Sequence, residues 1–134
     1  MSLQILIVDD DPDDLELLEE AILELEPASR IDKATGGKAA IEYLDNYNDS
    51  RLPNLIILDY NMPEVNGSAV LEHISAQDRY RQVPRIVFST SDAPLHKKDC
   101  LTRGATEYFV KPTTKKQLDL IAKKMLSFLP GISH

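Results

Sequence analysis

The chain has 134 residues, of which 43% are hydrophobic and 28% charged, and its formal net charge is −7 at pH 7. This length fits a single domain over residues 1–134, and the composition is that of a globular protein rather than a disordered one. The negative charge disfavours nucleic-acid binding, which needs Lys and Arg to neutralise phosphates, so proteins or cations are the expected partners.

The longest apolar runs, residues 5–8 and 55–58, are far shorter than the roughly 20 residues of a membrane-spanning helix. The first residues lead directly into a predicted strand, without the regions of a secretory signal. The single cysteine, Cys100, cannot form a disulfide or a metal cluster within the chain, and we expect a small core or helix residue there. We therefore expect a cytoplasmic protein without a membrane partner.

Strand-forming runs alternate with segments of helical length, and this alternation predicts an α/β domain with a parallel sheet. In chain order the predicted elements are a strand Gln4–Val8, a helix from Pro12 that ends at Pro27, a strand Arg30–Ala34, a helix Gly37–Tyr47, a strand Leu55–Leu58, a helix Gly67–Gln77, a strand Arg85–Ser89, a helix Pro94–Arg103, a strand Thr106–Val110 and a helix that opens with Thr114. Five strands and five helices in strict alternation predict a doubly wound fold, with sites at the carboxyl ends of the strands.

Two predicted helices differ in their sequence support. Thr114 and Gln117 form a capping box, and an apolar stripe follows them at helical spacing. The helix Pro94–Arg103 has only Leu95 and Leu101 on its apolar face. We expect this helix to be loosely anchored.

Polar residues follow four of the predicted strands directly. They are Asp9, Asp10 and Asp11, then Asp59, then Ser89 and Thr90, and finally Lys111 and Pro112. The carboxyl ends of parallel strands meet at one edge of a sheet, so these residues should converge. Clustered carboxylates repel one another unless a cation lies among them. Mg²⁺ fits best because it prefers a few oxygen ligands and completes its shell with water or phosphate, whereas zinc would need nearby His or Cys.

The same edge could hold a phosphoryl group. Lys111 supplies an ammonium and Ser89 a hydroxyl, so an anionic oxygen between them and the metal would be contacted from three sides. Asp59 stands alone opposite the acidic pair and is the best candidate nucleophile, which would form an acyl phosphate.

These residues resemble the receiver domains of two-component response regulators, a family with single-domain members such as the bacterial chemotaxis regulator. The matching segments cover nearly the whole chain and are residues 5–10, residues 58–63 with Gly67, residues 89–90 and residues 108–112. The resemblance implies a flavodoxin-like sheet of order 2-1-3-4-5. It also implies a signalling domain rather than an enzyme.

The resemblance further implies individual roles. Asp59 would accept the phosphoryl group, and Mg²⁺ would be held by Asp9, Asp10, Asp59 and the backbone carbonyl of Asn61. Ser89 would be the switch hydroxyl and Tyr108 the switch aromatic. Lys111 would contact the phosphate, with a cis peptide bond to Pro112.

The implied donor is a sensor histidine kinase or a histidine phosphotransfer protein. After transfer, Ser89 would approach the phosphoryl oxygens and Tyr108 would move inward, which would change a face built from the fourth helix, the fifth strand and the fifth helix. This face could bind a downstream protein of unknown identity or form a homodimer. The long segment Asp45–Asn54 and the pair Thr90-Ser91 resemble small receivers that work with phytochrome-type kinases, and the bulk of Thr90 could narrow access to the site.

Several other interpretations remain open at this stage. Asp13 and Asp14 are read as solvated acids that favour a helix N-terminus, and Asp11 is left open between a role in the acidic site and a helix cap. A calcium loop fails because its sixth position is not Gly and because a strand precedes it. A phosphatase similar to the haloacid dehalogenases, or a receiver fold that works without phosphorylation, are the alternative functions. The three histidines are scattered, and none is expected to act as a base or ligand.

Overall fold

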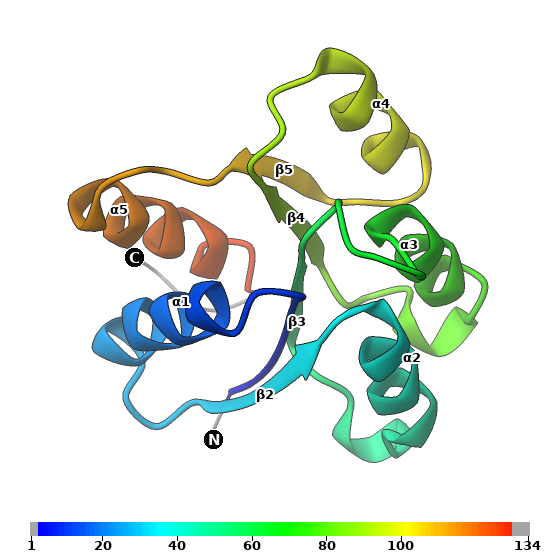
Figure 1. The fold of residues 1–134 in the computed structure, drawn as a ribbon. Helices are drawn as coiled ribbons and strands as arrows, with labels where there is room; N and C mark the ends of the chain where they lie inside the picture. The colour runs from blue at the N-terminus through cyan, green and yellow to red at the C-terminus, as the bar shows by residue number, and fades with distance from the viewer. Residues whose placement is uncertain (1–2, 130–134) are drawn as a thin grey trace.

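The structure is a computed structural model and describes residues 3–129. Five parallel strands form one sheet in the order β2-β1-β3-β4-β5. In chain order the elements are β1 Gln4–Asp9, α1 Pro12–Leu25, β2 Arg30–Thr35, α2 Gly37–Asn46, η1 Asp49–Arg51, β3 Leu55–Leu58, α3 Gly67–Ser75, η2 Asp78–Tyr80, β4 Arg85–Ser89, α4 Pro94–Thr102, β5 Glu107–Val110 and α5 Lys115–Leu126. Figure 1 shows this arrangement, which confirms the predicted fold.

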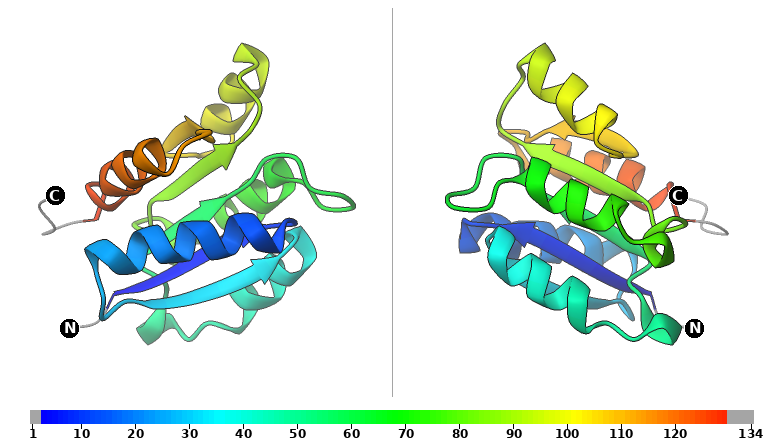
Figure 2. Two further views of the ribbon diagram at one scale, coloured as in Figure 1. Left: turned by 60° about the vertical axis from the view of Figure 1, so that its left-hand side comes forward. Right: turned by 90° about the vertical axis from the view of Figure 1, so that its right-hand side faces the viewer.

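Helices cover both faces of the sheet. Helices α1 and α5 lie side by side on one face, while α2, α3 and α4 cover the other (Figure 2). Alternate residues of each central strand enter opposite cores, because successive side chains of a strand point to opposite faces. In β1, Ile5 and Ile7 pack beneath α1 and α5, and Leu6 and Val8 pack beneath α2 and α3. This burial on both faces explains why residues 5–8 of β1 and the whole of β3 are apolar.

The helix termini follow their sequence signals. The side chain of Asp11 accepts a hydrogen bond from the backbone N–H of Asp13 at 2.9 Å, and that of Thr114 accepts one from Gln117 at 3.2 Å. Asp11 is therefore the cap of α1, as its position suggested, and Thr114 is the cap of α5.

Some boundaries differ from the prediction. Helix α2 ends at Asn46 because Tyr47 has an extended backbone, and α3 ends at Ser75 instead of Gln77. Strand β5 begins at Glu107 instead of Thr106. The N–H of Thr106 donates to the Arg85 carbonyl, and this bond connects the preceding turn to the β4–β5 ladder. The two short 3₁₀ helices were not predicted, because three residues carry too little periodicity.

Helix α4 is held by few apolar contacts, as expected. Cys100 is its only buried residue, while Leu95 is 78% exposed and Leu101 is 49% exposed. Cys100 itself lies in the core, which confirms the prediction of a structural cysteine.

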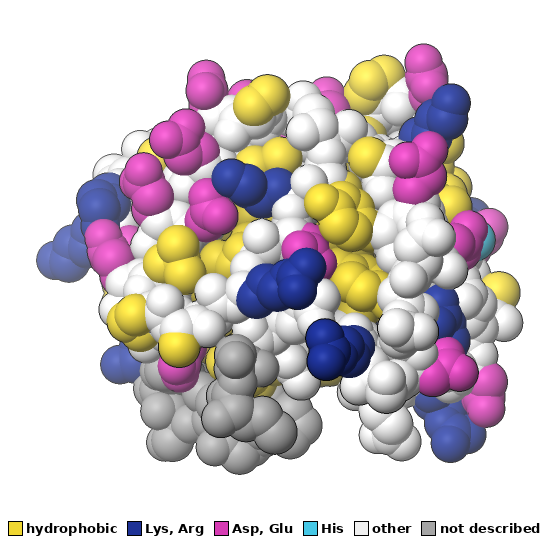
Figure 3. Space-filling view, turned by 90° about the horizontal axis from the view of Figure 1, so that it is seen from below, with side chains coloured by type: hydrophobic (Ala, Val, Ile, Leu, Met, Phe, Trp, Pro, Cys, Tyr) yellow, Lys and Arg dark blue, Asp and Glu magenta, His cyan; other side chains and the backbone are white. Residues whose placement is uncertain are grey.

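Among residues 3–129 the structure contains no helix with the length and apolarity that crossing a membrane requires. On the face seen from below Figure 1, Lys and Arg side chains are scattered among acidic and uncharged ones (Figure 3). Among the described side chains of that face, the basic ones form no continuous surface.

Candidate functional site

The polar residues that end four strands meet at one edge of the sheet. Asp9 is the last residue of β1, Asp59 follows β3, Ser89 ends β4 and Lys111 follows β5. Backbone hydrogen bonds between neighbouring strand ends fix these positions, since Asp59 N–H donates to the Val8 carbonyl at 3.0 Å and Lys111 N–H to the Ser89 carbonyl at 2.8 Å. The parallel topology therefore brings together residues that are far apart in the sequence.

Three of these residues form a cluster of carboxylates. Asp9, Asp10 and Asp59 each offer an oxygen, and the three oxygens lie within 4.8 Å of one another. Asp9 and Asp59 are buried, with 5% and 6% of their surface exposed, while Asp10 faces solvent. Oxygen ligands with one side open to solvent suit a hard divalent cation such as Mg²⁺ that keeps some of its water.

The buried carboxylates are in an unfavourable electrostatic position. Burial raises the pKa of Asp9 to about 6, although hydrogen bonds from Lys111 and from the backbone of Asp11 partly offset this effect. Burial also raises the pKa of Asp59, against the lowering effects of the Lys111 charge, the Tyr60 N–H and a hydrogen bond with Ser89. A cation among these oxygens would favour their charged forms.

Lys111 reaches into the acidic cluster. Its Nζ donates to Asp9 Oδ2 at 2.6 Å and to Asp14 Oδ2 at 2.9 Å, and it lies 3.7 Å from Asp59 Oδ2. Burial alone would lower the pKa of Lys111, but the hydrogen bonds to Asp9 and Asp14 and the charge of Asp59 outweigh it, so the pKa is raised. Lys111 is thus a fixed positive charge next to Asp59.

Ser89 and Tyr108 are joined through Ser91. The N–H of Ser91 donates to Ser89 Oγ at 3.2 Å, and its carbonyl accepts from Tyr108 Oη at 2.8 Å. Ser89 is fully buried and Tyr108 is 8% exposed. The Tyr108 ring already lies inside the protein in this structure, so an inward movement has little distance left to cover.

Gly67 allows α3 to begin directly beside Asp59. A Cβ atom at Gly67 would lie 2.4 Å from the carbonyl oxygen of Asp59 and 2.8 Å from Cα of Tyr60. The Gly67 N–H also donates to the Tyr60 carbonyl at 2.8 Å. Only glycine fits this close approach of helix and strand end.

One expectation about the site is wrong. The structure contains no cis peptide bond among residues 3–129, so the Lys111–Pro112 bond is trans. A trans bond needs no special explanation, since it is favoured by about 0.5–1 kcal/mol even before proline.

Two predicted site residues lie at the solvent side. Asn61 is exposed in the loop after β3, two residues beyond Asp59, and Thr90 is exposed directly after β4. The carbonyl role of Asn61 and the steric role of Thr90 remain predictions.

Sequence reasoning missed the role of Asp14. It was read as a solvated acid, but its carboxylate binds Lys111 and its side chain is only 36% exposed. The missed signal is its place in the first turn of α1, three residues after the Asp11 cap, where a helix directs side chains back toward its N-terminal end.

Tyr60 and Asp99 form a second network that the sequence did not reveal. Asp99 on α4 accepts hydrogen bonds from Tyr60 Oη at 3.1 Å, from Ser68 Oγ at 2.5 Å and from Arg103 Nε at 2.7 Å. The Tyr60 ring also stacks on His96, with 4.7 Å between ring centroids. These polar contacts join α4 to the loop after Asp59.

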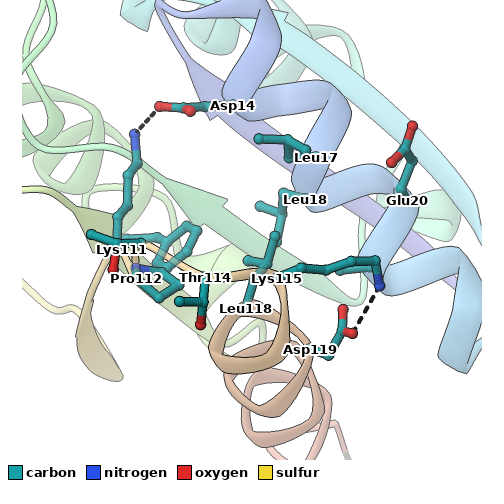
Figure 4. A pocket seen from close by; sticks show the side chains of 13 residues that line it. Asp14, Leu17, Leu18, Glu20, Lys111, Pro112, Thr114, Lys115, Leu118 and Asp119 are labelled. Carbon is teal, nitrogen blue, oxygen red and sulfur yellow. Dashed lines mark hydrogen bonds and ion pairs between the residues drawn. The ribbon is translucent and has the colours of Figure 1, made fainter.

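A cavity of about 220 Å³ lies between α1 and α5, next to Lys111 (Figure 4). Its lining is largely apolar, with Leu17, Leu18, Phe88, Pro112 and Leu118, and Asp14 and Lys111 close one end. The acidic cluster itself lies outside this cavity.

Comparison with protein families gives one match to the chain. The model of the response regulator receiver domain matches residues 5–123. Among sequences, the two-component response regulator ORR7 of Oryza sativa subsp. japonica is 31% identical over 99 residues, which cover 72% of this chain and 45% of the regulator. The chain thus spans less than half the length of that relative.

Two solved structures are similar over nearly their full length. The phosphorylated cyanobacterial phytochrome response regulator RcpA has a TM-score of 0.88 and 25% identity, covering 100% of this chain and 98% of that one. The Mn²⁺-bound form of the response regulator Rcp1 has a TM-score of 0.82 and 26% identity, covering 98% and 97%. The family match leaves the phosphatase alternative without support.

Proposed function

Because the chain belongs to the response regulator receiver domain family, we propose that Asp59 accepts a phosphoryl group from a histidine kinase or a histidine phosphotransfer protein. The observation that carries the proposal is the convergence of Asp59 with two further carboxylates and with Lys111 at one edge of the sheet. Receiver domains act as signalling modules, so the proposed product is a phosphorylated switch rather than a released compound.

The proposed cofactor is Mg²⁺. Asp9, Asp10, Asp59 and the backbone carbonyl of Asn61 would hold it, and the geometry of the three carboxylates supports this choice. The bound ion would offset negative charge on the transferring group. The manganese ion named for the similar Rcp1 structure supports a divalent cation.

The residues of the chain have separate parts in the transfer. An oxygen of Asp59 attacks the phosphorus and forms the acyl phosphate, while the bond from phosphorus to the histidine nitrogen of the donor breaks. Lys111, which lies 3.7 Å from Asp59, would contact a phosphoryl oxygen. The Ser89 hydroxyl, whose Oγ accepts from the Ser91 N–H, would turn to a second oxygen.

The switch would pass from Ser89 through Ser91 to Tyr108. A shift of the Ser89 hydroxyl changes its bond to the Ser91 N–H, and the Ser91 carbonyl holds the Tyr108 hydroxyl. Since the Tyr108 ring is already inside, phosphorylation would stabilise this inward position rather than create it.

The proposed output is binding of a downstream protein at the face of α4, β5 and α5. Leu95, Leu101 and Leu120 are exposed large apolar side chains on the two helices, and they support a contact with a partner or a second copy. We further propose that residues 1–134 form one receiver domain of the small type that serves phytochrome-like kinases in the cytoplasm. The similarity to RcpA supports this.

Labelling with a small phosphodonor tests the proposal. Acetyl phosphate with Mg²⁺ should add one phosphoryl group, and peptide mapping should place it on Asp59. The variant Asp59→Asn and the wild type with a chelator should remain unlabelled. A wild-type mass that does not change, or equal labelling of Asp59→Asn, would contradict the proposed function.

A further inference from the structure

Lys111 has a carboxylate partner that does not belong to the metal cluster. Its Nζ donates to Asp14 on α1 at 2.9 Å (Figure 4). It also donates to Asp9 at 2.6 Å. Asp9 is one of the three carboxylates that lie within 4.8 Å of one another, and Asp14 is not. Asp9 can therefore serve both Lys111 and a metal ion, whereas Asp14 is outside the carboxylate cluster.

A carboxylate that serves as a metal ligand shares less charge with a neighbouring ammonium. If Asp9 takes part in binding the cation, Asp14 is the remaining carboxylate within 3 Å of Lys111 among the described residues. A lysine side chain has four carbons and many rotamers, so an ammonium without a fixed partner spends less time in one place. The ammonium has three N–H bonds, and one can stay on Asp14 while the others face phosphoryl oxygens.

Resting on the function proposed above, we propose that Asp14 is a positioning residue that holds the Lys111 ammonium within reach of the phosphoryl group on Asp59. Asp14 is suited to this part because α1 is firmly packed. Leu15 and Leu18 of the same helix are buried in the core beneath it. The position of Asp14 is therefore fixed by the packing of α1 and does not depend on the metal.

Asp13 provides a matched control. Both acids lie in the first turn of α1, where either charge stabilises the positive end of the helix dipole. Asp13 is exposed, its backbone N–H donates to Asp11, and among residues 3–129 its carboxylate has no hydrogen bond or ion pair. Replacing Asp13 by Asn removes the same charge from the same turn without touching Lys111.

The first experiment compares rates of Asp59 labelling by acetyl phosphate. Asp14→Asn should label about tenfold more slowly, as expected for the loss of one charge-assisted hydrogen bond, and Asp14→Glu should recover most of the rate. Asp13→Asn should stay within about twofold of the wild type. In a Lys111→Ala background, Asp14→Asn should cause no further slowing. Equal slowing by Asp13→Asn and Asp14→Asn would overturn the proposal in favour of a helix-end effect.

A second readout needs neither metal nor phosphodonor. All proteins compared carry Asp9→Asn, which leaves Asp14 as the charged carboxylate within 3 Å of Lys111 among the described residues. Reductive methylation followed by mass spectrometry then reports how accessible the Lys111 amine is. Methylation of Lys111 should rise when Asp14→Asn is added to this background and stay unchanged when Asp13→Asn is added. Unchanged methylation on adding Asp14→Asn would overturn the proposal. If the wild type accepts no phosphoryl group, the proposed function fails, and methylation still decides whether Asp14 holds Lys111.

Discussion

At the scale of single residues, the main feature is a pair of buried carboxylates that the fold holds at an electrostatic cost. Asp9 and Asp59 are almost fully buried, and burial raises the pKa of both, even though Lys111 lies between them. A buried charge is stable only with adequate partners. The cost is consistent with a site built to bind a cation rather than to stabilise the fold.

Asp9 gives a prediction about stability and pH. Its pKa is about 6 in the folded protein against 3.8 as the ordinary value, so the folded state holds the proton more tightly than the unfolded state. Ionisation of Asp9 therefore destabilises the metal-free protein fully above pH 6, and this penalty disappears as the pH falls toward 4. Asp9→Asn should then stabilise the metal-free protein at pH 8 by roughly 3 kcal/mol, since the pKa rises from 3.8 to about 6 and each pKa unit corresponds to 1.36 kcal/mol.

Thermal or urea unfolding of both proteins, with a chelator present, provides the measurement. The advantage of Asp9→Asn should shrink steadily between pH 8 and pH 4. An Asp9→Asn protein that is less stable than the wild type at pH 8 would show that the Lys111 contact outweighs the cost of burial.

The sequence predicts a site residue well when its place in the chain fixes its place in space. Asp9, Asp59, Ser89 and Lys111 each end or follow a strand, and parallel strands bring such positions together. Asp14 was missed because an acid in the first turn of a helix already has a sufficient local explanation. Its bond to Lys111 spans 97 positions and depends on how α1 and β5 face each other.

At the scale of elements, α3 approaches the end of β3 very closely beside Asp59. Helix α3 starts at Gly67 against the backbone of Asp59 and Tyr60. Alanine in a helix is usually favoured over glycine by up to about 1 kcal/mol. The approach of 2.4 Å reverses that expectation, because the new Cβ would meet backbone atoms that cannot move aside.

Gly67→Ala should therefore destabilise the protein, by about 1–3 kcal/mol as for other overpacked sites. It should also slow phosphorylation of Asp59, since the clash displaces the backbone of that residue. Chemical unfolding and the labelling rate measure the two effects. A variant as stable as the wild type would mean that α3 can shift without strain.

Helix α4 shows the limit of prediction at this scale. The sparse apolar face predicted a loose helix, and the exposure of Leu95 and Leu101 agrees. The sequence did not reveal that Asp99 bonds to Tyr60 and Ser68, because those partners lie 39 and 31 positions away. Hydrophobic periodicity reports burial, but it carries no information about which distant polar groups meet.

At the scale of the whole molecule, the alternation of strands and helices determined the fold class. Two-sided burial of β1 and β3 was visible as unbroken apolar runs, and the order β2-β1-β3-β4-β5 followed from the family resemblance. The exact ends of α2 and α3 were missed by one or two residues, since local turn geometry decides them.

The distribution of charge at this scale leads to the central claim. The protein has a net charge of −7 and places three carboxylates at one edge, next to Lys111, whose side chain is only 10% exposed. This arrangement should bind a divalent cation even without a phosphodonor.

Isothermal titration of the metal-free protein with Mg²⁺ at pH 8 tests this claim most directly. The account predicts saturable binding of one ion, which Asp10→Ala abolishes and Asp13→Asn leaves intact. A wild-type protein that shows no saturable Mg²⁺ binding, or an Asp10→Ala variant that binds equally well, would contradict it.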